Sequence, residues 1–410
     1  MTTYSDNFLK AIPKTDLHVH LDGSLRVSTI IDMAKEQKLA LPSYTEEGLG
    51  ELVFKARYAD LNEYLQGFQY TVAVLQTPEA LERAAYEFAQ DNFAEGVRYV
   101  EPRFAPQLHS NAAMPVDEVI ASVDRGLSRA RREINLRPEI SSGEEPSFQY
   151  GIIGCAMRMF TGEFSAYYRR LVEMHPDMPQ KELHELAALD LVRALIKARD
   201  DRGMPIAGFD LAGAERGYPA ETHRTAYDLA HKHFLKKTVH AGEDYGPASI
   251  FQAITDCHAD RIGHGTHIFD ESLVELPTGP EREHYVRALW QYIADRRITI
   301  EVCLTSNLQT MPQLKDIKDH PFSKMLDKRL SVTFCTDNRL VSHTTVTGEI
   351  ELAVTNFTIP QYKLKDLIIY GFKRSFFPGD YMAKREYIRK IIDYYEKMEK
   401  VHGNELKAQS

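Results

Sequence analysis

The sequence has little cysteine and no long apolar run, and each absence narrows the classes of protein that it could encode. Its four cysteines, Cys155, Cys257, Cys303 and Cys335, are scattered, without a C-x-x-C pair or disulfide-like spacing. We interpret them as reduced thiols of a cytoplasmic protein. No apolar stretch approaches the ~20 residues that a membrane-spanning helix needs, and residues 1–14 lack the pattern of a signal peptide. The sequence therefore predicts a soluble intracellular protein with no membrane partner.

An excess of positive charge is also missing. The formal net charge is −9 and no basic stripe is present, which disfavours nucleic acid as a partner. The hydrophobic share of 43% and the charged share of 27% fit a globular protein with a large core. Because neither an interdomain linker nor a repeat is visible, we expect a single domain over residues 1–410.

Short apolar or β-branched runs alternate with helical sequence along the chain. The runs cover residues 16–21, 97–104, 149–156, 205–213, 237–243, 260–265, 298–304 and 330–338. Such alternation predicts a parallel sheet with helices outside it, and eight βα units make a TIM-type barrel. A doubly wound open sheet is the alternative, but the Gly-x-Gly-x-x-Gly turn expected after its first strand is absent. The predicted fold class is therefore α/β, a (β/α)8 TIM-type barrel with helical insertions.

Three helical regions stand outside the simple alternation. Residues 159–202 exceed what one crossover requires and predict a barrel helix plus an insertion. Residues 61–70 place Leu61, Tyr64, Leu65 and Phe68 on one helical face. Helices are expected to continue after residue 378, followed by a frayed polar tail from residue 403.

The first run carries two histidines, His18 and His20, at positions i and i+2. In a strand these two imidazoles project to one side, whereas Leu17, Val19 and Leu21 project to the other. A two-imidazole face is suited to a metal. Taken alone, a half-exposed strand with two incidental histidines explains the pattern equally well.

Polar residues recur where the other predicted strands end. These residues are Glu101 and Arg103, Gly213, His240 and Glu243, His264, Asn307, and Asp337 with Asn338. A TIM-type barrel brings the carboxyl ends of all its strands to one face, where its active site lies. The spacing therefore predicts one site built from distant segments.

Within that site, His18, His20, His240 and Asp337 supply three nitrogens and one carboxylate oxygen. This set suits Zn²⁺, with a further position open to water. Related barrels with two metals bridge them through a modified lysine on the fourth strand, and residues 208–213 contain no lysine. We therefore expect one zinc ion per chain.

Asp337 is a candidate catalytic residue as well as a metal ligand, since it is able to accept a hydrogen bond from the metal-bound water. Two further residues have chemistry that a zinc-activated hydroxide would use. His264 is a candidate to take up the water proton or to stabilise the hydroxide. Glu243 lies three residues beyond a metal ligand and is a candidate to protonate a substrate, which requires a raised pKa. Structural alternatives are a core histidine at His264, a helix start at Glu243 and an internal salt bridge between Glu101 and Arg103.

The motifs together resemble the adenosine deaminase family. The segments are Leu-His-Val-His-Leu-Asp-Gly-Ser from Leu17, Asp-Leu-Ala-Gly from Asp210, Val-His-Ala-Gly-Glu from Val239, Arg-Ile-Gly-His-Gly from Arg261 and Thr-Asp-Asn from Thr336. They occur in the family's order, within shared features from about residue 13 to residue 378.

The resemblance implies a zinc-dependent (β/α)8 barrel that converts adenosine or a close analogue to the inosine form and releases ammonia. Hydroxide would attack C6 of the purine while Glu243 protonates N1, and His264 would orient the hydroxide. Substrate contacts carry over to His20 and Asp22 on the ribose side, to the backbone at Gly213 and to Asn338. The helix over residues 61–68 resembles the family's apolar lid.

One position departs from the family pattern. Many members have a second aspartate where this chain has Asn338, and that position contacts N7 of the purine. An asparagine amide donates to N7 at any pH, so purine deamination remains the expected reaction. The alternatives are another 6-aminopurine substrate, such as adenine or an aminofutalosine-type nucleoside, hydrolysis of a C–O or P–O bond, and a non-catalytic purine-binding protein.

Overall fold

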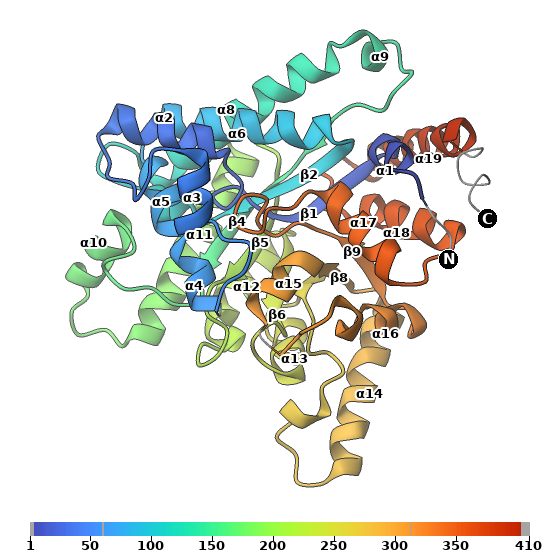
Figure 1. Cartoon of the computed structure of the whole chain (residues 1–410). Coiled ribbons are helices and arrows are strands. Elements are labelled where there is room, and N and C mark those ends of the chain that lie inside the picture. Colours follow the sequence, from blue (N-terminus) through green and yellow to red (C-terminus); the bar gives the residue numbers. More distant parts are fainter. Residues whose placement is uncertain (1–3, 60, 312, 403–410) are drawn as a thin grey trace.

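The structure, a computed structural model, describes residues 4–59, 61–311 and 313–402 (Figure 1). Its centre is a parallel sheet in the order β1-β2-β4-β5-β6-β7-β8-β9, with the short β3 paired beside β2. The strands are β1 Lys14–His20, β2 Val97–Phe104, β3 Gln149–Tyr150, β4 Ile152–Met157, β5 Ile206–Ala212, β6 Lys236–Ala241, β7 Arg261–His264, β8 Thr299–Val302 and β9 Ser331–Phe334.

The sheet closes on itself between its last and first strands. A parallel bridge joins Val19 and Asp337. His20 N–H donates to Asp337 O over 2.7 Å, and Asp337 N–H donates to His18 O over 2.8 Å. The predicted barrel is thereby confirmed. The third predicted strand differs in detail, because Gly151 interrupts it and separates β3 from β4.

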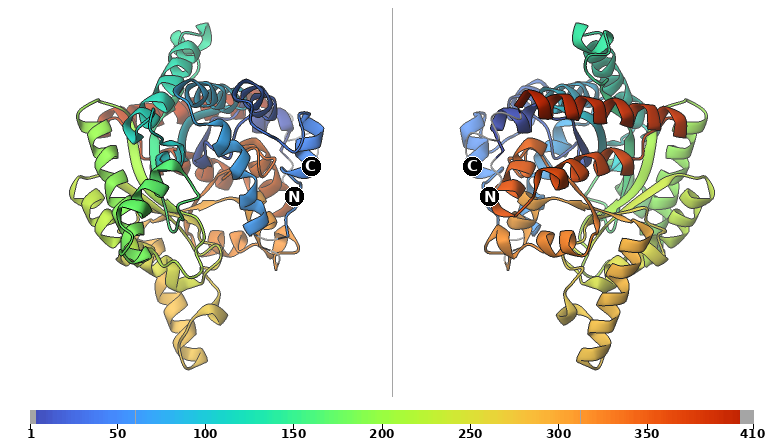
Figure 2. Two further views of the ribbon diagram at one scale, coloured as in Figure 1. Left: turned by 90° about the vertical axis from the view of Figure 1, so that its left-hand side faces the viewer. Right: turned by 90° about the vertical axis from the view of Figure 1, so that its right-hand side faces the viewer.

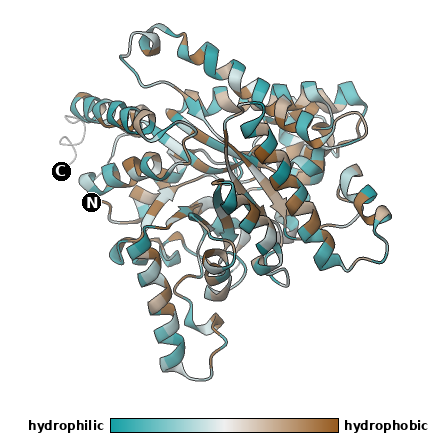
Figure 3. Ribbon diagram, turned by 180° about the vertical axis from the view of Figure 1, so that it is seen from behind, coloured by the Kyte–Doolittle hydropathy of each residue, from teal (hydrophilic) through white to brown (hydrophobic). Residues whose placement is uncertain are grey.

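Strand β1 is buried on both faces, as parallel barrel strands are. Leu17 and Val19 are buried on the side of the helices, and His18 on the other side is also buried. The interpretation of this stretch as a half-exposed strand is therefore wrong. In Figure 3 apolar colours are concentrated at the strands, and the outer helices carry hydrophilic colours.

Helices surround the strands, and α8 and α14 project from the body in opposite directions (Figure 2). The first nine helices are α1 Asp6–Ala11, α2 Val27–Gln37, α3 Glu46–Leu52, α4 Leu61–Gln66, α5 Phe68–Val74, α6 Pro78–Ala94, α7 Pro106–His109, α8 Val116–Asn135 and α9 Pro138–Ser141. The others are α10 Ala166–Met174, α11 Gln180–Asp200, α12 Arg224–Lys232, α13 Pro247–Thr255, α14 Gly279–Arg296, α15 Leu304–Thr310, α16 Phe322–Asp327, α17 Val346–Asn356, α18 Gln361–Arg374 and α19 Tyr381–His402.

The helical insertion predicted at residues 159–202 is present, whereas the single helix predicted over residues 61–68 is not. Residues 159–202 form α10 and α11, with a small core of Phe160, Tyr168, Leu183 and Ala187. The second region is two helices, because the chain breaks at Gly67 between α4 and α5. The tail from residue 403 lies outside the described residues. In the described part of the chain, every helix is too short or too polar to cross a bilayer.

Candidate active site at the carboxyl end of the barrel

Four side chains, from three strands and from the loop after a fourth, meet at the carboxyl end of the barrel. One atom each from His18, His240, His264 and Asp337 lies within 4.8 Å of the others. His20 joins them, since its Nε2 is 3.1 Å from His240 Nε2 and 3.5 Å from Asp337 Oδ1. The residues come from β1, β6, β7 and the loop after β9. The predicted clustering of distant segments is confirmed.

Carboxylates behind the cluster orient two of the imidazoles. Glu301 Oε2 is 2.8 Å from His18 Nδ1, and Asp210 Oδ2 is 3.1 Å from His240 Nδ1. A histidine held in this way presents its Nε2 lone pair to a metal. His18 Nε2 is buried and lacks a hydrogen-bond partner among the described residues, as expected of an atom that binds a metal. The donor set therefore fits a metal ion.

Arg103 connects these two carboxylates. Its Nη1 donates to Asp210 over 2.8 Å, and its Nη2 donates to Glu301 over 2.9 Å. Glu101 pairs with Arg261 instead. The expected salt bridge between Glu101 and Arg103 is therefore wrong. Side chains at i and i+2 of β2 enter the barrel in different layers, so each meets partners from other strands.

Burial acts to lower the pKa of His18, but the carboxylates of Asp337 and Glu301 raise it. Burial lowers the pKa of His20 to about 3 and lowers the pKa values of His240 and His264. The latter three rings are unprotonated at neutral pH, which is the form that binds metals. Burial acts to raise the pKa of Asp337, but His18, whose Nε2 is 3.4 Å from Asp337 Oδ1, and the other imidazoles hold that pKa well below its usual range.

The backbone at two of these residues is strained. His264 has a φ of 64° and Asp337 has a φ of 61°. A non-glycine residue in the left-handed region costs about 1–3 kcal/mol. Because β9 ends at Phe334, strand alternation does not position Asp337. Its carboxylate is fixed instead by Ser306, whose hydroxyl donates to Oδ2 over 2.6 Å.

Glu243 lies beside the cluster with few partners. Its Oε2 is 3.6 Å from His264 Nε2, and its Oε1 is 3.2 Å from Thr310 Oγ1. Burial, with the nearby charges of Asp337 and Glu215, raises the pKa of Glu243 from 4.5 to about 8. The expectation of a raised pKa at this carboxyl is confirmed.

Glu215 was not anticipated from the sequence. Its buried carboxylate accepts the successive backbone N–H groups of residues 242–245 at 2.7 to 3.1 Å, together with the Ser249 hydroxyl. It therefore fixes the loop that carries Glu243. The only signal in the sequence is an acidic residue two positions after Gly213, which is too general to identify such a role.

Asp22 follows β1 and is almost fully buried. Its Oδ2 is 3.6 Å from His109 Nε2, and among the described residues neither Asp22 Oδ1 nor His109 Nε2 has a hydrogen-bond partner. His109 is a second residue that sequence reasoning missed, since it belongs to the short helix α7 and matches no motif. Gly213, with a φ of 99°, occupies a conformation that only glycine adopts readily.

Asn338 contacts the helix expected to form a lid. Its Nδ2 donates to Tyr64 Oη over 2.8 Å, and Tyr64 Oη is 2.8 Å from Ser342 Oγ. The Oδ1 atom of Asn338 is buried without a hydrogen-bond partner in the part of the chain that the structure describes. Helix α4 therefore contributes a polar contact as well as apolar surface; the side chain of Leu61 lies outside the described set.

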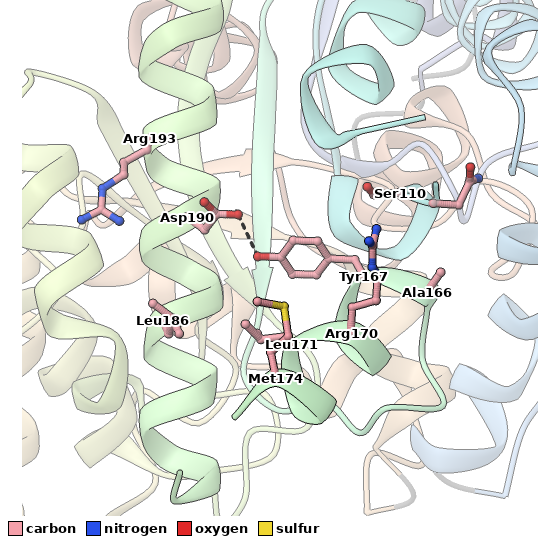
Figure 4. Close-up of a pocket in the computed structure, with 10 residues that line it drawn as sticks. Ser110, Ala166, Tyr167, Arg170, Leu171, Met174, Leu186, Asp190 and Arg193 are labelled. Atoms are coloured by element: carbon pink, nitrogen blue, oxygen red, sulfur yellow. Dashed lines mark hydrogen bonds between the residues drawn. The ribbon is translucent and has the colours of Figure 1, made fainter. Parts of the chain in front are cut away.

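The insertion forms a separate pocket of about 360 Å³ between α7, α10 and α11 (Figure 4). Tyr167 Oη donates to Asp190 over 2.8 Å across it. None of its lining residues belongs to the histidine cluster, although Ser110 directly follows His109.

The closed parallel barrel and the buried group of histidines and aspartate define a (β/α)8 barrel with a candidate metal site at its carboxyl end. The adenosine deaminase family profile matches residues 13–394. An adenosine deaminase of Mycobacterium avium (strain 104) is 37% identical over 376 residues, which cover 91% of this chain and 92% of that protein. The chain belongs to the adenosine deaminase family and is a hydrolase acting on C–N bonds.

Two solved structures share the fold at low identity. The adenine deaminase of Arthrobacter aurescens has a TM-score of 0.71 at 22% identity, covering 94% of this chain and 100% of that one. An amidohydrolase from Burkhoderia ambifaria with bound Zn has a TM-score of 0.75 at 20% identity, covering 98% and 95%.

Proposed function

We propose that this chain is a zinc-dependent deaminase of adenosine and 2′-deoxyadenosine in purine metabolism, releasing inosine or 2′-deoxyinosine and ammonia. The observation that carries the proposal is Glu243, a largely buried carboxyl with a pKa of about 8 beside a histidine–aspartate cluster. Such a carboxyl is protonated at neutral pH and is able to donate to a purine nitrogen.

His18, His20, His240 and Asp337 hold one zinc ion per chain in this proposal. A zinc ion held there would supply a nucleophilic oxygen at neutral pH, because it would lower the pKa of water to about 7. The unpartnered Nε2 of His18 and the low pKa values of His20 and His240 support this assignment.

Glu243 protonates N1 of the purine as the oxygen adds to C6. The added proton places negative charge on the carboxylate instead of the ring, and C6 becomes tetrahedral. The proton of the added hydroxyl passes to N6 as the C6–N6 bond breaks, so that ammonia leaves and C6 keeps the oxygen as a carbonyl. The proton lost by the attacking water restores Glu243, and one water is consumed for each ammonia formed. The surrounding burial favours the neutral form of Glu243 before the step.

The substrate is recognised at its ribose and at its ring. Asp22, which has an unpartnered buried oxygen, accepts a hydrogen bond from a ribose hydroxyl, and His20 contacts the same side of the ribose. Asn338 Nδ2 has two hydrogens, and Tyr64 Oη accepts one of them. The other is available to purine N7, and the backbone at Gly213 contacts the opposite part of the ring.

A substrate panel tests this function. Adenosine, 2′-deoxyadenosine, adenine, AMP and a 5′-modified nucleoside are assayed for ammonia release by metal-free protein and by the same protein reloaded with zinc. We expect ammonia from adenosine and 2′-deoxyadenosine in the zinc-loaded protein only. Ammonia from adenine alone would transfer the activity to the free base, and no ammonia from any compound would refute deamination.

The variant Asp22→Ala, assayed with the same compounds, tests whether Asp22 contacts the ribose, because adenosine has a ribose and adenine does not. Loss of a contact to a ribose hydroxyl leaves a buried group unpaired and costs about 1–3 kcal/mol. The kcat/KM for adenosine should therefore fall about tenfold or more, whereas any turnover of adenine should be unchanged. An equal fall for both compounds would refute the ribose contact.

A further inference from the structure

We propose that a buried hydrogen-bond chain from the backbone of Phe322 through His320 and Asn307 fixes the proton of His264 on Nε2. His264 is then a hydrogen-bond donor toward the reacting oxygen and neither a base nor a metal ligand. The catalytic part of this inference rests on the proposed function, but the position of the proton does not.

The chain consists of three short contacts among buried groups. Phe322 N–H donates to His320 Nδ1 over 3.1 Å. His320 Nε2 is 3.3 Å from Asn307 Oδ1, and Asn307 Nδ2 is 3.1 Å from His264 Nδ1. His264, Asn307 and His320 are at most 2% exposed. Water therefore does not compete for these hydrogen bonds.

The direction of each bond follows from its first member. A backbone N–H can only donate, so His320 Nδ1 must accept. Burial lowers the pKa of His320 to about 3, so the ring is neutral and its single proton is on Nε2. That N–H donates to Asn307, and the atom that receives it must be the carbonyl oxygen Oδ1.

The amide of Asn307 is thereby oriented with its nitrogen toward His264. With the amide reversed, Nδ2 would donate to His320 Nε2, and both ring nitrogens of His320 would have to accept. A neutral imidazole has one N–H and cannot accept at both nitrogens. The backbone donor at Phe322 therefore excludes the reversed orientation.

His264 is the last member of the chain. Its Nδ1 accepts from Asn307 Nδ2 and so has no proton, which leaves the ring with its one proton on Nε2. Nε2 faces the cluster, 3.6 Å from Glu243 Oε2. A ring in this state has no free lone pair on that side. Asn307 and His320 are consequently positioning residues for His264.

The proton position is measurable without turnover. In protein labelled with 15N at histidine, protonated and unprotonated ring nitrogens give well-separated resonances, and a His264→Gln variant identifies the His264 signals. We expect Nε2 to be protonated and Nδ1 unprotonated in both metal-free and zinc-loaded protein. A proton on Nδ1 would overturn the inference in either state.

Matched variants then test the consequence for catalysis. Asn307→Asp keeps the size but replaces the donor by an acceptor, so it should move the His264 proton to Nδ1. We expect kcat to fall about 100-fold or more, the range of general acid–base contributions, with zinc content unchanged at one per chain. Wild-type kcat in a folded Asn307→Asp protein with the moved proton would overturn the donor role.

His320 offers a pair of variants with opposite expectations. In His320→Gln the side-chain amide nitrogen takes the position of His320 Nε2 and still donates to Asn307. In His320→Asn the shorter side chain reaches only the position of Nδ1, so the donor to Asn307 is lost. His320→Gln should retain kcat within about threefold, and His320→Asn should lose about tenfold or more. Equal loss in both variants would show that packing alone matters. If the variants fail to fold, the wild-type 15N measurement still decides the proton position.

Discussion

Charged groups in the centre of the barrel are fully buried and Glu243 at its mouth is largely buried, with a side chain 14% exposed, but the two differ in their partners. In the centre, Arg103 and Arg261 pair with Glu301 and hold its pKa well below the usual range, although burial acts to raise it. At the mouth, no lysine or arginine pairs with Glu243 among the described residues, and its pKa is about 8. A buried carboxyl therefore stays charged where an arginine pairs with it, and it becomes a proton donor where neither a lysine nor an arginine does.

Removing the proton donor at the mouth should have the largest effect. Glu243→Gln keeps the size of the side chain but has no acidic proton. Since general acid catalysis contributes about 10²–10⁴-fold, we expect kcat to fall by about 10³-fold or more. Steady-state ammonia release measures the fall, and metal analysis should show unchanged zinc content. Loss of zinc in parallel with activity would assign Glu243 to the metal site instead.

Removing the cation in the centre tests the other half of the comparison. Arg103→Met leaves Asp210 and Glu301 without a shared partner, and breaking a buried pair costs about 3–5 kcal/mol. The affinity for zinc should fall about 10- to 100-fold, because both carboxylates orient metal-binding histidines. Denaturant unfolding and chelator competition measure the two effects.

Arg83→Met is the matched control for that prediction. Arg83 pairs with Asp32 and Glu87 on the surface, where its side chain is 38% exposed. Exposed pairs contribute about 0–1 kcal/mol, so this variant should unfold nearly as the wild type does and should bind zinc normally. Similar losses in the two variants would show that burial is not what makes the Arg103 pairs important.

The carboxylate of Glu215 should have an intermediate effect, since it acts on Glu243 only through the loop. Glu215→Gln presents an amide N–H₂ to part of a row of backbone N–H donors, so at least one of the bonds to residues 242–245 is lost. A displaced catalytic group costs up to about 10²-fold, and we expect a 10- to 100-fold fall in kcat with little change in KM. In a Glu243→Gln background the same change should have almost no effect; an additive fall would refute action through Glu243.

Asp260→Asn is the control at the other end of the same strand. Asp260 accepts from Lys237 N–H near the start of β6, as Glu215 accepts from the loop after that strand. This substitution should lower stability without changing kcat. A fall in kcat equal to that of Glu215→Gln would show that any disturbance of β6 has the same result.

The sequence predicted the parts of the site that follow from barrel geometry alone. His18, His240 and His264 come together because the carboxyl ends of parallel strands converge, and alternating apolar runs are sufficient to locate those ends. The partners of Arg103 depend on the layer that each side chain occupies inside the barrel, which sequence spacing does not reveal. The left-handed backbone of Asp337 and the loop held by Glu215 arise from contacts with distant segments, so they too required the structure.

Glu349 is a buried carboxyl with a raised pKa that, unlike Glu243, has no role assigned in the site. Its replacement should therefore have the smallest effect on activity. Burial raises its pKa from 4.5 to about 7, and it accepts from Thr305 N–H and Thr344 Oγ1, without a lysine or arginine partner among the described residues. A carboxyl whose pKa is raised on folding stabilises the protein most below pH 4.5, and this contribution is lost as the pH rises through 7. Glu349→Gln has no such titration, so its free energy of unfolding relative to wild type should increase by about 2–3 kcal/mol between pH 5 and pH 8. Urea unfolding at the two pH values measures the difference, and an unchanged difference would mean that hydrogen bonds alone hold this carboxylate charged.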